Sequence, residues 1–181
     1  MISYSPSHKD LEGLRIDRIA EKLGLDPVET IVRLLIDDEI ATGMILFGMN
    51  EEDVDKVISS PLVAIGSDGS VGRFGVGKPH PRRYGTFPRI IARYVREKKL
   101  LSLQEAVRKM TSLPARKLRL WDRGLIRPGF KADLVVFDFY KIEDTATYEN
   151  PHSYPRGIKY VIINGRIVLR EGSGEILRRE M

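Results

Sequence analysis

The chain contains no cysteine and only three histidines. Without cysteine it forms no disulfide and offers no thiolate to a metal ion. Its histidines, His8, His80 and His152, are not spaced as paired metal ligands, whereas a zinc site needs about three protein ligands. The chain is therefore not expected to bind zinc tightly by itself.

Long apolar runs are also missing. No stretch approaches the ~20 apolar residues of a membrane span. The polar segment 3–9 does not have the pattern of a signal peptide. Together these observations predict a cytoplasmic protein with no membrane partner.

The charge of the chain is moderately basic, with 30 Lys and Arg against 25 Asp and Glu. Basic and acidic residues alternate along most of the sequence, and local basic concentrations occur only at 78–83, at 116–119 and at Arg178-Arg179. No recognition helix or RNA-binding signature accompanies them. The basic residues are interpreted as solvated surface, and no nucleic acid is expected as a partner.

Several helices are marked by their capping residues. Apolar residues recur at helical spacing over 11–23. The next helix has Asp26 as its N-cap and Pro27 at its first position, and we expect it to end at Gly43. Asn50 is expected to cap a third helix.

Helices also follow in the second half of the chain. Pro88 is expected to start one, because proline is favoured in the first turn. Ser102 and Glu105 form a capping box for the next, and Pro114 is expected to start another.

Strands are predicted from short apolar runs. The predicted strands are 44–47, 62–65, 134–137, 160–163 and 167–169. The last two are separated by Asn164-Gly165, which is typical of a hairpin with a type I′ turn. In the first half, strands alternate with helices, and this alternation predicts an α/β fold.

The segment Gly72–Lys78 matches the G-x-x-x-x-G-K part of a phosphate-binding loop. Pro79 stands where that motif needs Ser or Thr, and Pro81 opposes the helix that should follow. The match therefore fails, and we interpret the segment as a mobile glycine loop beside a substrate site.

Ser67-Asp68-Gly69 directly follows the predicted strand 62–65. A carboxylate at the end of a buried strand is where parallel α/β proteins place catalytic groups. The same tripeptide is also good turn material in any protein. From these residues alone, Asp68 is either a catalytic carboxylate or a turn residue.

A longer set of motifs carries a family resemblance. It consists of Gly66-Ser67-Asp68-Gly69, the string from His80 to Arg89, and the segments 94–97, 102–115, 122–129, 132–138 and 161–165. In this order, they resemble the C-terminal part of the N-acyl-D-amino-acid deacylases, or D-aminoacylases, of the amidohydrolase superfamily.

This resemblance implies a fold. Residues 1–128 would form the C-terminal part of a (β/α)8 barrel, and residues 129–181 the C-terminal strands of a small β-sandwich. The helices after Pro88 would pack on the barrel, with Val107, Met110 and Leu118 in the core. Trp121 is expected to be a packed anchor, and His152 to lie in a loop.

The resemblance also implies an activity. The complete enzyme would use zinc to hydrolyse the linear amide of an N-acyl-D-amino acid, giving a D-amino acid and a carboxylate. Asp68 would transfer protons between water and the leaving nitrogen, and would serve as a supplementary zinc ligand. Arg82 would hold the carboxylate of the substrate, with His80 beside it.

The length of the chain limits what it can do alone. A complete barrel takes about 250 residues, and this sequence has 181. We therefore expect a C-terminal fragment or subunit that is inactive by itself. Its partner would be the remaining N-terminal part of the enzyme or a second copy of the chain. The alternative is a non-catalytic remnant or assembly module with the same fold.

Overall fold

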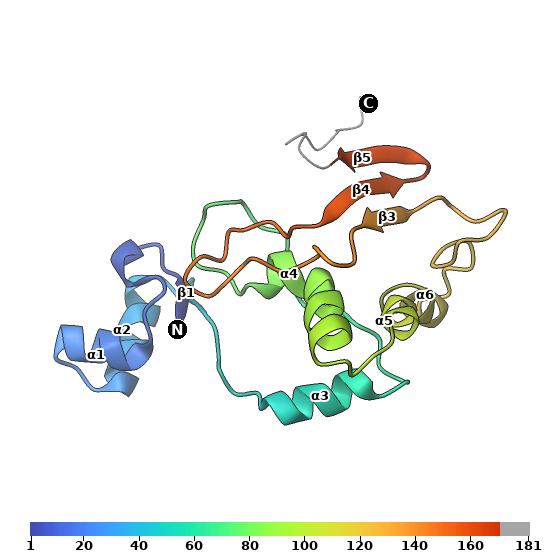
Figure 1. The fold of residues 1–181 in the computed structure, drawn as a ribbon. Coiled ribbons are helices and arrows are strands. Elements are labelled where there is room, and N and C mark those ends of the chain that lie inside the picture. The colour runs from blue at the N-terminus through green and yellow to red at the C-terminus, as the bar shows by residue number, and fades with distance from the viewer. Residues whose placement is uncertain (171–181) are drawn as a thin grey trace. The chain divides into compact units, whose positions relative to one another are not determined.

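The computed structural model describes residues 1–170 (Figure 1). Arg178-Arg179 and the end of the segment 129–181 lie outside this part of the chain. The described residues divide into two compact units. Unit 1 comprises Met1–Met49, Asp68–Tyr84 and Ala146–Ser153, and unit 2 comprises the intervening segments and the C-terminal strands. None of the helices in the described part is long and apolar enough to cross a membrane.

Unit 1 contains two helices and a short sheet. Strand β1 (Ile2–Tyr4) pairs antiparallel with β2 (Gly43–Met44), and a 3-10 turn (Lys9–Leu11) leads to α1 (Ile16–Leu23) and α2 (Pro27–Asp37). Their apolar faces meet in a core of Ile2, Leu11, Ile19 and Leu34.

The predicted start of α2 is confirmed. The Asp26 carboxylate accepts a hydrogen bond from Val28 N–H at 2.8 Å, and Pro27 occupies the first helical position. The helix ends at Asp37, before the expected Gly43, because Glu39 and Ile40 adopt positive φ angles of 50° and 68° that stop helical bonding.

Unit 2 begins with α3 (Glu51–Ser59), capped as predicted by Asn50, whose side chain accepts from Glu52 N–H at 2.8 Å. Helices α5 (Leu103–Met110) and α6 (Ser112–Lys117) follow later. The Ser102 hydroxyl accepts from Glu105 N–H at 3.1 Å, as expected at the start of α5. The buried core of this unit consists of Ile58, Ile90, Tyr94, Val95, Leu101 and Ala106.

The helix expected to begin at Pro88 begins earlier. Helix α4 spans Arg82–Arg89 with Pro88 inside it, and it is followed by a π-helical turn over Ile90–Glu97. Proline has no N–H and clashes with the carbonyl four residues before it in a regular α-helix. After Pro88 the helix continues with i→i+5 hydrogen bonding, the pattern of a π-helix.

The C-terminal sheet agrees closely with its prediction. Strands β3 (Leu134–Phe137), β4 (Ile158–Ile163) and β5 (Arg166–Arg170) form an antiparallel sheet in that order. Asn164 and Gly165 have φ angles of 50° and 78°, as a type I′ turn requires.

Two predicted strands do not form as expected. Of the predicted strand 44–47, only Met44 lies in a strand, namely β2 (Gly43–Met44). Leu46 is 81% exposed. The segment 62–65 has no strand at all, and Leu62 is 77% exposed. A strand needs a neighbour for its ladder of hydrogen bonds, and in this segment Ile65 N–H bonds instead to the Lys109 carbonyl of α5.

Several expected core residues are on the surface. Leu118 and Trp121 are 69% and 70% exposed, and Val107 is 37% exposed. Met110 does pack against the core of unit 2. Within residues 1–170 the fold is a mixed α/β arrangement with two small antiparallel sheets and no closed barrel.

Candidate functional site

Asp68 and Arg82 are brought together in unit 1. An Asp68 carboxylate oxygen lies 3.0 Å from an Arg82 guanidinium nitrogen. The side chains are 87% and 45% exposed, so both groups are accessible to solvent. Asp68 has a φ of 47°, a left-handed conformation that Asp tolerates better than most residues. Asp68 lies in a loop, because the preceding segment 62–65 forms no strand.

The glycines around Asp68 allow a close approach to α4. A Cβ at Gly69 would lie 3.0 Å from the Cα of Arg83, and one at Gly72 would lie 2.6 Å from its guanidinium. Arg83 also donates to the Ser70 hydroxyl at 3.1 Å. The glycine-rich loop thus folds closely over the first turn of α4, which carries Arg82.

His80 organises the residues just before that helix. Its Nδ1 accepts a hydrogen bond from Arg82 N–H at 3.0 Å, and its Nε2 lies 3.1 Å from the Tyr148 hydroxyl. Because Nδ1 accepts, the proton of the neutral ring is assigned to Nε2, which donates to Tyr148. His80 therefore contacts the backbone of Arg82 in addition to lying near it in sequence.

His152 lies in a loop, as expected, but it also has a role that the sequence did not reveal. Its ring contacts the glycine loop at Gly75 and Gly77 and the hydroxyl of Tyr84. These partners lie 68 to 77 residues away along the chain. No local pattern could have indicated them.

The contacts of the segment Gly72–Lys78 also differ from those of a phosphate-binding loop. Lys78, which would contact phosphate in that motif, donates from Nζ to the Glu149 carbonyl at 3.0 Å. Its backbone N–H donates to the Ser3 carbonyl at 2.6 Å. Helix α4 does not begin until Arg82, so no helix N-terminus faces the loop at the position where a phosphate-binding motif needs one.

A zinc site is not assembled by this part of the chain. Among residues 1–170, no three His, Asp or Glu side chains lie close enough together to hold a metal ion. The Asp68 carboxylate is paired with the Arg82 guanidinium. A metal cation on the same carboxylate would be repelled by that positive charge. The donor set described here does not fit the three protein ligands that zinc requires.

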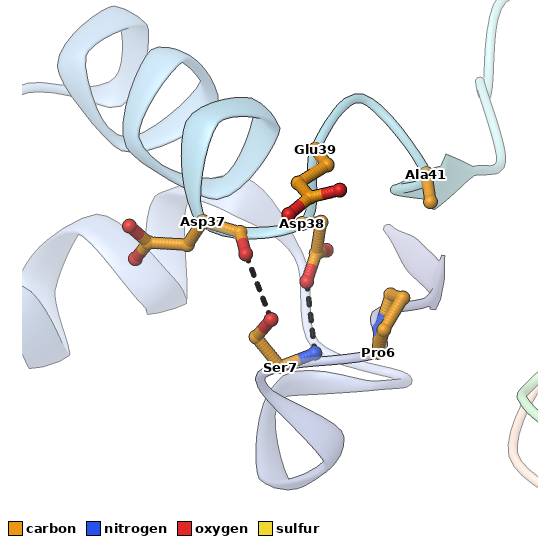
Figure 2. A pocket seen from close by; sticks show the side chains of 6 residues that line it. All are labelled: Pro6, Ser7, Asp37, Asp38, Glu39 and Ala41. Carbon is orange, nitrogen blue, oxygen red and sulfur yellow. Dashed lines mark hydrogen bonds between the residues drawn. The ribbon is translucent and has the colours of Figure 1, made fainter.

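A pocket of about 380 Å³ lies elsewhere in unit 1 (Figure 2). It is lined by Pro6, Ser7, Asp37, Asp38, Glu39 and Ala41. The Ser7 hydroxyl donates to the Asp37 carbonyl at 2.8 Å, and Ser7 N–H donates to the Asp38 carboxylate at 2.9 Å.

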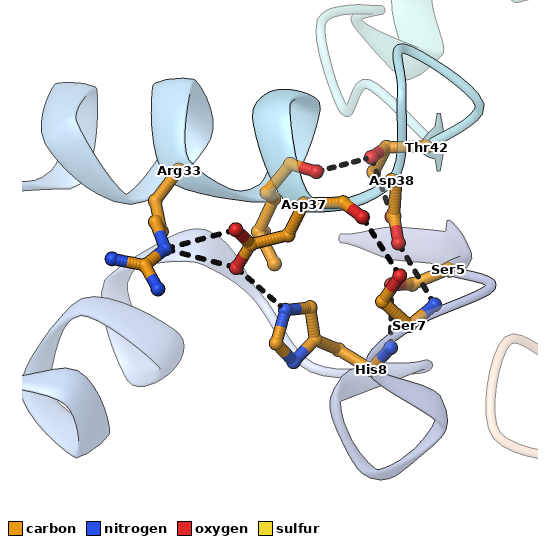
Figure 3. A network of polar contacts seen from close by, with 8 residues as sticks. Ser5, Ser7, His8, Arg33, Asp37, Asp38 and Thr42 are labelled. Atoms are coloured by element: carbon orange, nitrogen blue, oxygen red, sulfur yellow. Dashed lines mark hydrogen bonds and ion pairs between the residues drawn. The ribbon is translucent and has the colours of Figure 1, made fainter.

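Two of the three acidic side chains that line this pocket, Asp37 and Asp38, are already engaged (Figure 3). Asp37 accepts from Arg33 Nε at 2.9 Å and lies 2.9 Å from His8 Nε2, and these hydrogen bonds lower its pKa. Burial tends to raise the pKa of Asp38, but hydrogen bonds from Thr42, Ser5 and Ser7 outweigh it and hold the pKa at about 2.

The pocket has no arrangement for nucleophilic catalysis. The Ser7 hydroxyl donates to a backbone carbonyl, so it is not paired with His8 as a base. The network ties the end of α2 to the segment Ser5–His8. We interpret it as structural.

Comparison with known proteins places these residues in a family. Residues 5–169 match the amidohydrolase family. The chain is 40% identical over 168 residues to the N-acyl-D-aspartate deacylase of Alcaligenes xylosoxydans xylosoxydans, covering 93% of this chain and 32% of that protein. It is 39% identical over 184 residues to the N-acyl-D-glutamate deacylase of the same organism, covering 99% of this chain and 36% of that one.

Solved structures agree with the sequence match. The N-acyl-D-glutamate deacylase of Bordetella bronchiseptica, complexed with zinc and a phosphonate inhibitor, matches with a TM-score of 0.86 and 36% identity, covering 97% of this chain and 35% of that one. A D-aminoacylase studied for its binuclear metal centre matches with a TM-score of 0.86 and 37% identity, covering 96% of this chain and 35% of that one.

The chain thus spans about a third of the length of these relatives. Within that third, the match runs through both units, through the loop that carries Asp68 and through the first turn of α4, which carries Arg82. The chain therefore belongs to the amidohydrolase family and is similar to the D-aminoacylases and N-acyl-D-amino-acid deacylases within it.

Proposed function

We propose that this chain forms the part of a zinc-dependent N-acyl-D-amino-acid deacylase that supplies the proton-transfer group and the anchor for the substrate carboxylate. The observation that carries this proposal is the pairing of Asp68 with Arg82 at 3.0 Å. The pairing places a carboxylate and a guanidinium side by side, so one small substrate can reach both groups. Both are exposed enough to be reached by it.

Asp68 is the proposed acid and base. Amide hydrolysis needs a group that accepts a proton from the attacking water and returns it to the leaving nitrogen. The Asp68 side chain is 87% exposed, so a substrate and a water molecule can reach its carboxylate.

Arg82 is the proposed anchor for the α-carboxylate. A guanidinium donates two parallel hydrogen bonds to a carboxylate, and Arg82 presents this group from the first turn of α4. His80 accepts from the backbone N–H of the same residue, so it fixes the start of the helix without using the guanidinium.

Acidic amino acids are the proposed substrate class. Two of the relatives are named for N-acyl-D-aspartate and N-acyl-D-glutamate. The glycine loop of this chain carries Arg73, which is exposed. A second carboxylate on the substrate would be favoured by a further guanidinium at this loop.

The zinc of such an enzyme would have to be held by ligands outside the described residues, because residues 1–170 bring no three donors together. We propose that a polypeptide equivalent to the rest of the relatives, or a second copy of this chain, completes the assembly. In it, residues 1–128 would contribute to a barrel and residues 129–181 to a small β-sandwich. Zinc, when bound there, would lower the pKa of the attacking water.

The lack of a three-donor cluster in the described part also favours a second candidate function. In that case the chain is a non-catalytic assembly module that keeps the fold and surfaces of the family. It would retain the contacts of Asp68 and Arg82 but take part in no reaction.

A chimera distinguishes the two functions. This chain replaces the matching third of the N-acyl-D-aspartate deacylase, and the chimera is loaded with zinc and assayed with N-acetyl-D-aspartate, N-acetyl-D-glutamate and their L-enantiomers. We expect release of the D-amino acids only. A chimera that folds and binds zinc like its parent but hydrolyses none of these substrates would contradict the proposed function and support the assembly module.

A further inference from the structure

Two crossed His–Tyr pairs join the segment 146–153 to the segment 80–84, which includes the first turn of α4. His80 Nε2 lies 3.1 Å from the hydroxyl of Tyr148, and the hydroxyl of Tyr84 lies 2.8 Å from His152 Nδ1. Each segment thus contributes one histidine and one tyrosine. All four residues belong to unit 1.

The ring of His152 has hydrogen bonds at both nitrogens. Its Nδ1 accepts from Gly75 N–H at 3.2 Å, and its Nε2 lies 2.9 Å from the Gly77 carbonyl. A carbonyl can only accept, so Nε2 carries a proton, and a backbone N–H can only donate, so Nδ1 carries none. Tyr84 must therefore also donate to Nδ1, where it shares the one lone pair with Gly75 N–H, and the ring is neutral with its proton on Nε2.

The same ring also packs on the glycine loop. The Phe74 and His152 ring centroids are 5.2 Å apart, and Tyr84 lies 5.7 Å from His152 on the same measure. Such tilted and edge-to-face contacts are favourable for aromatic rings. His152 therefore contacts three residues of the loop, Phe74, Gly75 and Gly77, and also Tyr84 in the first turn of α4.

We propose that His152 is a positioning residue that holds the Gly72–Lys78 loop against the start of α4. Tyr84 lies two residues after Arg82, so the loop and the proposed carboxylate anchor are held by one imidazole. The link to substrate binding depends on the proposed role of Arg82. The positioning of the loop does not, and it is tested on the chain alone.

The test measures the loop amides by nuclear magnetic resonance. We expect the ¹⁵N shifts of His152 to report a neutral ring protonated at Nε2 at pH 7.5. In His152→Ala, the Gly75 amide should exchange with solvent about fivefold faster, as the loss of one hydrogen bond worth about 1 kcal/mol implies. Trypsin should also cleave faster after Arg73, which is exposed in the loop.

Conservative variants separate positioning from packing. The Oδ1 of Asn can replace Nδ1 as an acceptor, so His152→Asn should restore slow exchange at Gly75, whereas His152→Gln should not. Tyr84→Phe removes only the phenol hydroxyl and should speed tryptic cleavage less than His152→Ala does.

His80→Ala provides the matched control. Arg82 N–H donates to His80, so its exchange should rise in His80→Ala and stay within twofold of the parent in His152→Ala. Unchanged exchange at Gly75 in a folded His152→Ala variant would overturn the proposal. So would a ring protonated at Nδ1, or an equal rise in exchange at all loop amides in His152→Asn and His152→Ala.

Discussion

Asp68 and Arg82 form an ion pair with 3.0 Å between their charged atoms, so the two residues proposed for chemistry are paired with each other. Both side chains are accessible, and ion pairs at such positions contribute about 1 kcal/mol or less to stability. Under the proposed function, a substrate carboxylate that binds Arg82 would compete with Asp68. Binding of substrate would thereby release the carboxylate for proton transfer.

The first prediction concerns Asp68→Asn. The free energy of unfolding of the chain should change by less than about 0.5 kcal/mol, because the ion pair is exposed. In the chimera that carries this chain, the same substitution should lower kcat by about 10² to 10⁴, because the proton acceptor is lost. Urea denaturation and steady-state kinetics measure the two effects. Activity within threefold of the parent would identify Asp68 as a turn residue.

The second prediction concerns acid stability. Asp38 has a pKa of about 2 in the folded chain, against an ordinary value of 3.8. Its ionised form therefore stabilises the fold above pH 4, and this contribution is lost as the pH falls from 4 to 2. The difference in unfolding free energy should be on the order of 2 kcal/mol.

The matched comparison is Asp38→Asn, in which this part of the pH dependence should vanish. Asp17→Asn changes an exposed carboxylate, with 65% of its side chain accessible, and should leave the acid transition unchanged. An identical acid transition in the parent and in Asp38→Asn would show that Thr42, Ser5 and Ser7 do not stabilise the carboxylate.

Local signals predicted much of the fold. The caps at Asp26, Asn50 and Ser102 were correct because a side-chain acceptor and a free helical N–H are neighbours in sequence. The turn at Asn164-Gly165 was correct because its positive φ angles restrict the residues that fit. These decisions depend on only a few consecutive residues.

Long-range features could not be predicted in this way. Whether 62–65 becomes a strand depends on a neighbouring strand, and in the described chain its partner is α5. The exposure of Trp121 likewise depends on what packs over it. At the candidate site, Asp68 and Arg82 were predicted from motifs, whereas His152 was missed because its partners lie in distant loops.

The third prediction concerns Lys109, which is fully buried in α5. Its ammonium donates to the carbonyls of Ser60 and Val63, and so holds the segment that leads to Asp68. Lys109→Met should lower the free energy of unfolding by about 2 kcal/mol, because two partly buried carbonyls lose their charged donor. Lys117→Met, at an exposed position in α6, should change it by less than about 0.5 kcal/mol. Equal effects would mean that the buried hydrogen bonds contribute nothing.

The fourth prediction compares two glycines that both have positive φ. At Gly157, with φ of 81°, a Cβ would lie 2.5 Å from the backbone nitrogen of Ile142. Gly24, with φ of 66° at the end of α1, has open space around that position. Gly157→Ala should destabilise the fold by about 3 kcal/mol or more, and Gly24→Ala by about 1 kcal/mol. Thermal unfolding followed by circular dichroism measures both, and similar shifts would show that only backbone conformation matters.

The last prediction is that the chain self-associates when it is produced alone. Leu46 and Met49 are 81% and 84% exposed in the extended segment after β2, and Leu62 and Ile126 are 77% and 91% exposed in unit 2. Exposed apolar side chains of this size favour contact with another protein surface over contact with water. The segment 46–49 belongs to no strand, so its backbone can also pair with another chain.

Light scattering at low micromolar concentration should therefore give a mass above 20.6 kDa that rises with concentration. Leu46→Glu should shift the distribution toward the monomer, because a charge at the contact opposes burial. Ser59→Glu adds the same charge at an exposed polar position and should have little effect. A mass of 20.6 kDa that does not change with concentration would contradict the prediction, since the exposed apolar residues would then be compatible with a stable monomer.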